Sequence, residues 1–167
     1  MSEEIKKGLL GIVVDETTIS HVVPELSALT YRGYTVQELC DKCDFEEVAY
    51  LVLHGELPNK SQLRKFIKEE RSNRKLSSQI LKDIKKMPKN AHPMDVIRTC
   101  VSLMALEDKD TKDNSPKANM RKAMRIFAKT PTAVAAYFRS RKGKSVISPS
   151  KNLSNKKDQK ENFLNKY

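Results

Sequence analysis

Residues 91–108, AHPMDVIRTCVSLMALED, carry the pattern that decides the fold class. Pro93 stands early in the segment, and proline is favoured in the first turn of a helix. Apolar residues then recur at intervals of three and four: Met94, Ile97, Val101 and Met104. This spacing places them on one helix face. The segment therefore predicts an amphipathic helix.

A longer helix is predicted downstream. The polar residues 107–115 read as a loop, and Pro116 or Lys117 opens a helix that runs to about Arg141. Pro131 interrupts its backbone hydrogen bonding and predicts a kink. The small residues that follow, which include Ala133 and Ala136, would let another helix approach closely.

Four shorter helices are predicted before residue 91. Their ranges are Val36–Cys43 after the cap Thr35, Phe45–His54 after the cap Asp44, a helix opened by Asn59 or Ser61, and Ser77–Lys86. In the second helix, the apolar positions are Phe45, Val48, Ala49 and Val52. The fold class is all-α.

The N-terminal residues predict extended chain instead. GIVV (11–14) and TTIS (17–20) flank Asp15-Glu16, which would form a hairpin turn. Gly33 marks a second turn. The chain is therefore divided into an extended or hairpin segment at 1–34, a helical part at 35–143, and a basic loop at 144–167 that ends in the start of another helix.

Composition excludes several classes of protein. The chain of 167 residues is 38% hydrophobic, which suits one packed domain. No stretch approaches the ~18 apolar residues of a membrane span, and acidic residues precede the first short apolar run, unlike a secretory signal. We expect a cytoplasmic protein without a membrane partner.

The net charge of +11 is unevenly distributed. Residues 1–56 carry −7, residues 57–137 carry +11 and residues 138–167 carry +7. Such a basic balance suits anionic partners, but it also occurs in any lysine-rich soluble protein. Aromatic residues are only 6% and tryptophan is absent, so the stacking platform of a nucleic-acid-binding protein is missing. We expect no nucleic-acid partner.

No catalytic, cofactor-binding or metal-binding residue is predicted. Cys40 and Cys43 form a CxxC, but no second pair completes a zinc site, so the cysteines are expected to pack as small hydrophobic residues. His54 is predicted to end a helix, and His92 to cap one or to lie in a loop. His21 has no assigned role. Arg32 would bind a carboxylate or tie a turn to nearby carbonyl groups, and the second role is favoured.

Several blocks, taken together, resemble the citrate synthases, and the 2-methylcitrate synthases most of all. They are KGLLGIVVDETTIS (7–20), LTYRGYTVQEL (29–39), FEEVAYLVLHGELP (45–58), AHPMDVIRTCVSLMALED (91–108), KTPTAVAAYFRSRKG (129–143) and ISP…ENFL (147–164). They follow the family's order and spacing over nearly the whole chain, which corresponds to the N-terminal portion of a family member.

The resemblance implies an all-α enzyme of two domains that acts as a homodimer. Such enzymes condense oxaloacetate with a short acyl-CoA and then hydrolyse the thioester, so acyl-CoA is a substrate and no cofactor is bound. The helix that begins at HPMD and the helix that ends in PTAVAAYFRSR would lie at the dimer interface. The predicted interface residues are Met94, Ile97, Val101, Met104, Ala133 and Ala136.

The resemblance also implies that this chain alone is inactive. The family's base is an aspartate and two histidines act on the enol and on the oxaloacetate carbonyl, and His21, His54 and His92 match neither histidine. The sequence does not separate acetyl-CoA from propionyl-CoA. Two alternatives remain: a non-catalytic dimerising protein derived from a synthase, and a basic nucleic-acid-binding protein.

Overall fold

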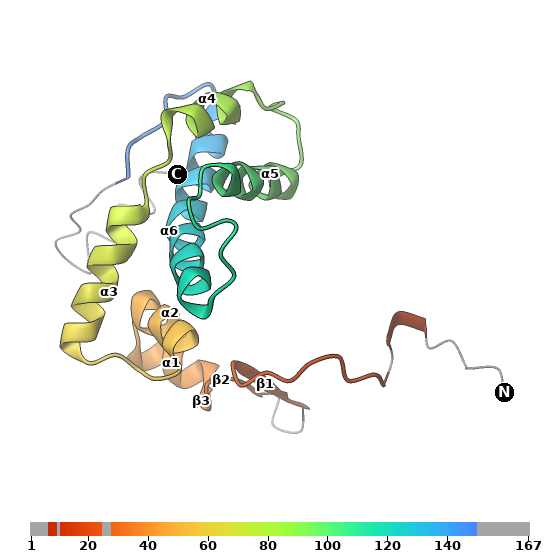
Figure 1. The fold of residues 1–167 in the computed structure, drawn as a ribbon, viewed down its shortest axis with the longest axis vertical. Helices are drawn as coiled ribbons and strands as arrows, with labels where there is room; N and C mark the ends of the chain where they lie inside the picture. The colour runs from red at the N-terminus through yellow and green to blue at the C-terminus, as the bar shows by residue number, and fades with distance from the viewer. Residues whose placement is uncertain (1–6, 10, 25–27, 150–167) are drawn as a thin grey trace. The chain divides into compact units, whose positions relative to one another are not determined.

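The structure is a computed structural model that describes residues 7–9, 11–24 and 28–149. It is mostly helical (Figure 1), and the predicted all-α class is confirmed. The α-helices are α1 (Val36–Lys42), α2 (Phe45–His54), α3 (Lys60–Asn73), α4 (Ser78–Lys86), α5 (Pro93–Leu106) and α6 (Pro116–Arg141). The expected helix start at residue 161 lies outside the described residues.

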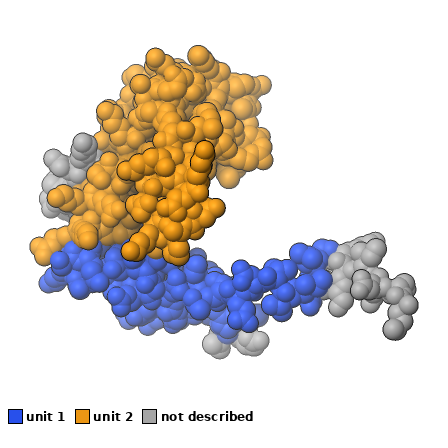
Figure 2. Space-filling model, viewed as in Figure 1, with its two compact units in different colours: residues 1–63 blue, residues 64–167 orange. Residues whose placement is uncertain are grey.

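The chain forms two compact units (Figure 2), residues 1–63 and residues 64–167. The division falls within α3. The boundaries expected at 34/35 and 143/144 separate the extended segment, the helical part and the basic loop. They do not mark compact units, so this division does not test them. Among the residues that the structure describes, no helix is both long and apolar enough to span a membrane.

A small antiparallel sheet precedes the helices, but it is not the predicted hairpin. Its strands are β1 (Ser20–Val23), β2 (Ala28–Tyr31) and β3 (Tyr34–Thr35), in that order across the sheet. The expected turn at Asp15-Glu16 is wrong, because residues 11–19 contain no strand. Asp15 instead accepts a hydrogen bond from the Glu16 amide at 2.8 Å, which gives a local bend without strand pairing.

The tight turn lies at Arg32-Gly33, between β2 and β3. Both residues have positive φ, 50° at Arg32 and 88° at Gly33, the combination that a type I′ hairpin turn requires. Tyr31 and Tyr34 pair across it. The prediction of a turn at Gly33 is therefore confirmed, and it closes the second hairpin of the sheet.

Predicted capping residues define the helices that follow. Thr35 accepts a hydrogen bond from the Glu38 amide at the start of α1, and Asp44 forms a capping box with Glu47 at the start of α2. Gly55 ends α2 with φ of 91°, a left-handed conformation that suits glycine. Asn59 opens α3, since its side chain accepts from the Ser61 and Gln62 amides.

The second unit has its core where α4, α5 and α6 meet. The buried residues there are Leu76, Ile80, Ile84, Val96, Cys100, Met104, Ala133, Ala136 and Tyr137. Each helix contributes residues at intervals of three and four, as an amphipathic helix should. Within α6, helical structure continues across Pro131, and Gly143 follows the helix with φ of 69°.

Candidate functional site

The six residues predicted at an interface divide into two groups by exposure. Met104, Ala133 and Ala136 are at most 5% exposed and belong to the core of the second unit. The two alanines present little more than backbone to their neighbours, so α6 can pack closely there. These three residues are already covered by their own chain, and their contact with a partner stays a prediction.

The other three residues reach solvent. Met94 is 62% exposed, and Ile97 and Val101 are half-buried on the same side of α5. We refer to these three residues as the α5 strip. The α5 strip is therefore an apolar face of α5 that the core of the second unit covers only in part.

A second exposed apolar strip runs along α6. Met120, Val134 and Phe138 are between 36% and 41% exposed, and we refer to them as the α6 strip. By their spacing, Phe127 and Pro131 lie on the same helix face as the α6 strip. From Met120 to Phe138 these five positions on this face are uncharged. Phe127 packs near Phe66 of α3, with ring centroids 6.3 Å apart. Single exposed apolar residues are ordinary, but a continuous uncharged face is typical of an interaction surface.

An ion-pair network joins the first half of α6 to the loop that follows α5. Arg125 donates to Asp108 at 2.7 and 2.8 Å and to Asp110 at 2.7 Å, and Arg121 donates to Asp110 at 2.8 and 3.0 Å. The hydrogen bonds from Arg121 and Arg125 hold the pKa of Asp110 well below its ordinary value. Arg125 lowers the pKa of Asp108 in the same way. The network therefore ties the α5–α6 loop to α6.

Sequence reasoning missed this network and recognised only a polar loop. A signal was present, because Arg121 and Arg125 are four residues apart and share a helix face. Acidic residues precede them in the loop. The pairing itself depends on how the loop folds back, which spacing alone does not determine.

The predicted local roles of two histidines agree with the structure. His92 caps α5, where its Nδ1 accepts a hydrogen bond from the Met94 amide at 3.3 Å. His54 is the last residue of α2 and stacks on Tyr50, with ring centroids 4.2 Å apart. His21 is exposed on β1. His21 and His54 belong to the first unit and His92 to the second.

Arg32 takes the favoured role of tying a turn. Its guanidinium donates to the carbonyl oxygen of Val52 at 3.1 Å and to Thr18 Oγ1 at 2.6 Å. The side chain thus links the β2–β3 turn to α2 and to the extended segment before β1. These two hydrogen bonds use the Nη1 and Nη2 atoms of Arg32.

The three cysteines are free thiols that differ in burial. Cys100 is buried, as predicted, whereas Cys40 is exposed and Cys43 is half-buried. Burial raises the pKa of the Cys43 thiol, with Glu47 and Asp44 adding to the effect, and burial also raises the pKa of Cys100. A raised pKa disfavours the nucleophilic thiolate. In the described part of the chain, no group of three or more His, Cys, Asp or Glu side chains could hold a metal ion.

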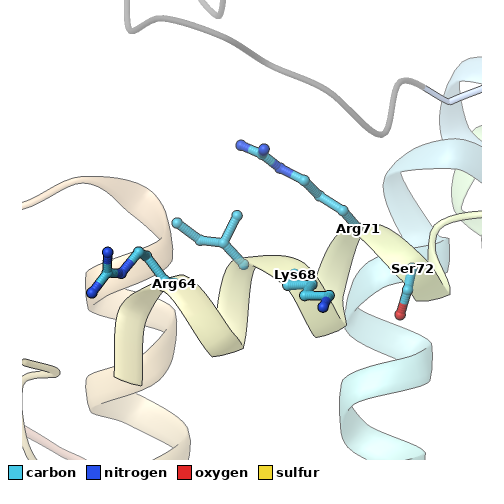
Figure 3. A pocket seen from close by; sticks show the side chains of 5 residues that line it. Arg64, Lys68, Arg71 and Ser72 are labelled. Atoms are coloured by element: carbon cyan, nitrogen blue, oxygen red, sulfur yellow. The ribbon is translucent and has the colours of Figure 1, made fainter. Parts of the chain in front are cut away.

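One hollow was not predicted from the sequence. It lies along α3 in the second unit and has a volume of about 500 Å³ (Figure 3). Its lining residues are Arg64, Ile67, Lys68, Arg71 and Ser72. Their spacing of three, four and seven puts them on one helix face, and this spacing is visible in the sequence.

Comparison with known proteins gives one consistent family. A family model described as "Citrate synthase, C-terminal domain" matches residues 8–167. The chain is 48% identical over 150 residues to a protein named 2-methylcitrate synthase from Mycobacterium tuberculosis, covering 90% of this chain and 38% of that one. It is 47% identical over 161 residues to a protein named citrate synthase from Mycolicibacterium smegmatis, covering 96% and 42%.

The fold agrees with the sequence comparison. The crystal structure of citrate synthase from Thermotoga maritima matches with a TM-score of 0.77 and 34% identity, covering 90% of this chain and 39% of that one. The chain thus spans about two fifths of the length of these relatives. On the family model, the sequence identities and the shared fold, the chain belongs to the citrate synthase family.

Proposed function

We propose that the chain forms the N-terminal part of the large domain of a citrate or 2-methylcitrate synthase. The complete enzyme would condense oxaloacetate with acetyl-CoA or propionyl-CoA, forming a carbon–carbon bond, and would act as a homodimer. The observation that carries this proposal is the match over residues 8–167 to the family, combined with coverage of only 38–42% of the curated relatives.

The acyl group stays open within the proposal. Relatives named 2-methylcitrate synthase and citrate synthase are 48% and 47% identical to this chain, a difference too small to separate their substrates. The proposed compartment is the cytoplasm. Free thiols at Cys40, Cys43 and Cys100 are consistent with a reducing environment.

We further propose that these 167 residues are inactive by themselves. Removal of a proton from the acyl-CoA α-carbon needs a positioned base, and the enolate that forms needs a hydrogen-bond donor beside it. His92 serves as a helix cap and His54 as a stacked helix end. These local structural roles support the proposal that the catalytic groups come from elsewhere in a complete synthase.

The mass of the protein made by its own cells tests the leading proposal. An intact mass near 2.5 times 19.1 kDa would support a complete synthase of the relatives' length, in which these residues are one part. A mass of 19.1 kDa would contradict it and would favour a separate role for the short chain. The longer form should then be assayed with both acyl-CoA substrates, since only it would hold the whole site.

A second candidate function is that of a non-catalytic dimerising protein, which the exposed α5 and α6 strips favour. Met94→Glu and Val134→Glu place a charge in each strip, while Ser102→Glu places the same charge on the polar, exposed side of α5. Light scattering after size-exclusion chromatography should give twice 19.1 kDa for the unaltered chain and for Ser102→Glu. The strip variants should be monomeric. A monomeric unaltered chain would contradict this second candidate.

A further inference from the structure

Two cysteines lie one helical turn apart at the end of α1, and neither has a role in the proposed function. Cys40 lies within the helix and is exposed, and Cys43 is its C-cap and is half-buried. Free cysteine is among the most buried residue types in proteins, so an exposed thiol with a second thiol one turn away is uncommon. The pair is independent of the proposed synthase activity.

Helix geometry places the two cysteines within reach of a disulfide bond. The Cys43 amide donates to the carbonyl oxygen of Leu39 at 3.0 Å, so the backbone is helical up to Cys43. Residues three apart in a helix lie on the same face. Their Cα atoms are about 5 Å apart, for a rise of ~1.5 Å per residue and a radius of ~2.3 Å. Disulfide bonds join Cα atoms that are roughly 4.4–6.8 Å apart.

The backbone at Cys43 leaves its side chain room to adjust. Cys43 is extended, with φ of −116° and ψ of 150°, so no further turn of α1 packs against it. Asp44, the next residue, is already the N-cap of α2. A bond between Cys40 and Cys43 would therefore tether the last turn of α1 to the junction between the two helices.

The two thiols differ in a way that suits a reaction in two steps. Cys40 is exposed and can meet a small molecule in solution. Burial raises the pKa of the Cys43 thiol, and Glu47 and Asp44 add to the effect. A thiol with a high pKa leaves slowly when its disulfide is attacked. A disulfide bond to Cys43 should therefore resist reduction once it has formed.

We propose that Cys40 and Cys43 are a modification site for low-molecular-weight disulfides, which convert the pair into an intramolecular disulfide bond. The Cys40 thiolate attacks one sulfur of the small disulfide, forms a mixed disulfide and releases one small thiolate. Cys43 then loses its proton to water, and its sulfur attacks Cys40 Sγ and releases the second thiolate. Two protein thiols are oxidised, and the small disulfide is reduced to two thiols, which take up the two protons lost by the protein.

Tryptic digestion of the full chain tests the proposal, because trypsin cleaves after Lys42, between the two cysteines. The reduced chain is incubated with glutathione disulfide and then unfolded, and its remaining thiols are blocked with N-ethylmaleimide. Mass spectrometry without a reductant should find the peptides 33–42 and 43–60 joined, and reduction should separate them. The unfolded protein should keep the mass of one chain. Separate peptides, or a disulfide between two copies of the chain, would overturn the proposal.

Cys100 is the internal control in the same digest. It is 1% exposed, in the core of the second unit, so the small disulfide should not reach it. Its peptide should be recovered with N-ethylmaleimide attached, and its reaction should be at least tenfold slower than that of the α1 pair. Oxidation of Cys100 at the same rate as the pair would refute a site specific to α1.

Two variants test the order of the steps. Cys43→Ser should stop the reaction after the first step, so Cys40 should keep one glutathione as a mixed disulfide. Cys40→Ser should react at least tenfold more slowly than the unaltered chain, because Cys43 is half-buried and its pKa is raised. Reaction of Cys40→Ser at the rate of the unaltered chain, or no glutathione on Cys40 in Cys43→Ser, would contradict the proposal.

Discussion

The Tyr137 hydroxyl lies 2.8 Å from the carbonyl oxygen of Pro88, to which it donates a hydrogen bond. The Tyr137 hydroxyl oxygen also lies 3.2 Å from the carbonyl oxygen of Ala91. The Arg141 guanidinium lies 5.6 Å from the centre of the Tyr137 ring. One buried side chain of α6 thereby holds the segment that leads into α5. This contact joins residues 49 apart in the sequence and fixes the α5–α6 geometry from within the core.

Tyr137→Phe should lower the free energy of unfolding by about 1–2 kcal/mol, because the ring is kept but two carbonyl groups lose their donor. Urea denaturation followed by circular dichroism measures the change. Tyr34→Phe is the matched control, since Tyr34 is 41% exposed and its removal of a hydroxyl should have little effect. Equal stability of Tyr137→Phe and the unaltered chain would contradict the structural role given to this hydroxyl.

The Asp110 network should make stability depend on pH. Its pKa lies below the ordinary 3.8 because Arg121 and Arg125 stabilise the carboxylate. A carboxyl group with a lowered folded pKa stabilises the fold above its unfolded pKa, and this contribution is lost as the pH falls below that value. The unaltered chain should therefore unfold at higher urea concentration than Asp110→Asn at pH 7, with the difference shrinking toward pH 3.

The control for this pH effect is Asp41→Asn, which alters an exposed carboxylate of α1. Its urea midpoint should follow that of the unaltered chain at each pH. A gap between Asp110→Asn and the unaltered chain that stays constant from pH 7 to pH 3 would show that the ion pairs with Arg121 and Arg125 are not its cause.

Ile84→Ala should be strongly destabilising, because Ile84 is 0% exposed in the core of the second unit. Removing its methyl and methylene groups loses buried apolar contact and leaves a cavity, which costs about 2–5 kcal/mol. Ile126→Ala is the control at a position 41% exposed, where a change of no more than about 0.5 kcal/mol is expected. Similar losses at both positions would place the core elsewhere.

Local sequence signals predicted most helix ends correctly. Thr35, Asp44 and His92 each precede the first residue of a helix and act as its N-cap, because capping depends on residues only two or three apart. Ser77 was predicted as the first residue of its helix and is instead the N-cap of α4. The hairpin predicted around Asp15-Glu16 was wrong because a local turn signal does not determine which segments pair as strands. Asp15-Glu16 resembles a turn locally, whereas the strands depend on Arg32 and Gly33 adopting positive φ.

Burial was harder to predict than helical structure. Phe45 was expected on the apolar face of α2, yet it is 70% exposed, while Leu51 is fully buried. The pattern of α2 allows more than one apolar face, and tertiary packing decides between them. The Asp110 network and the hollow beside Arg71 escaped prediction because both depend on three-dimensional proximity, which a single sequence does not give.

The release of free thiol from acetyl-CoA or propionyl-CoA in the presence of oxaloacetate tests the central claim most directly. The claim is that this chain carries part of a synthase fold without its catalytic groups. Purified chain should release no more thiol than buffer alone, under conditions in which the Mycolicibacterium smegmatis relative is active. Thiol release that requires both oxaloacetate and acyl-CoA, and that remains with the chain through further purification, would contradict the claim.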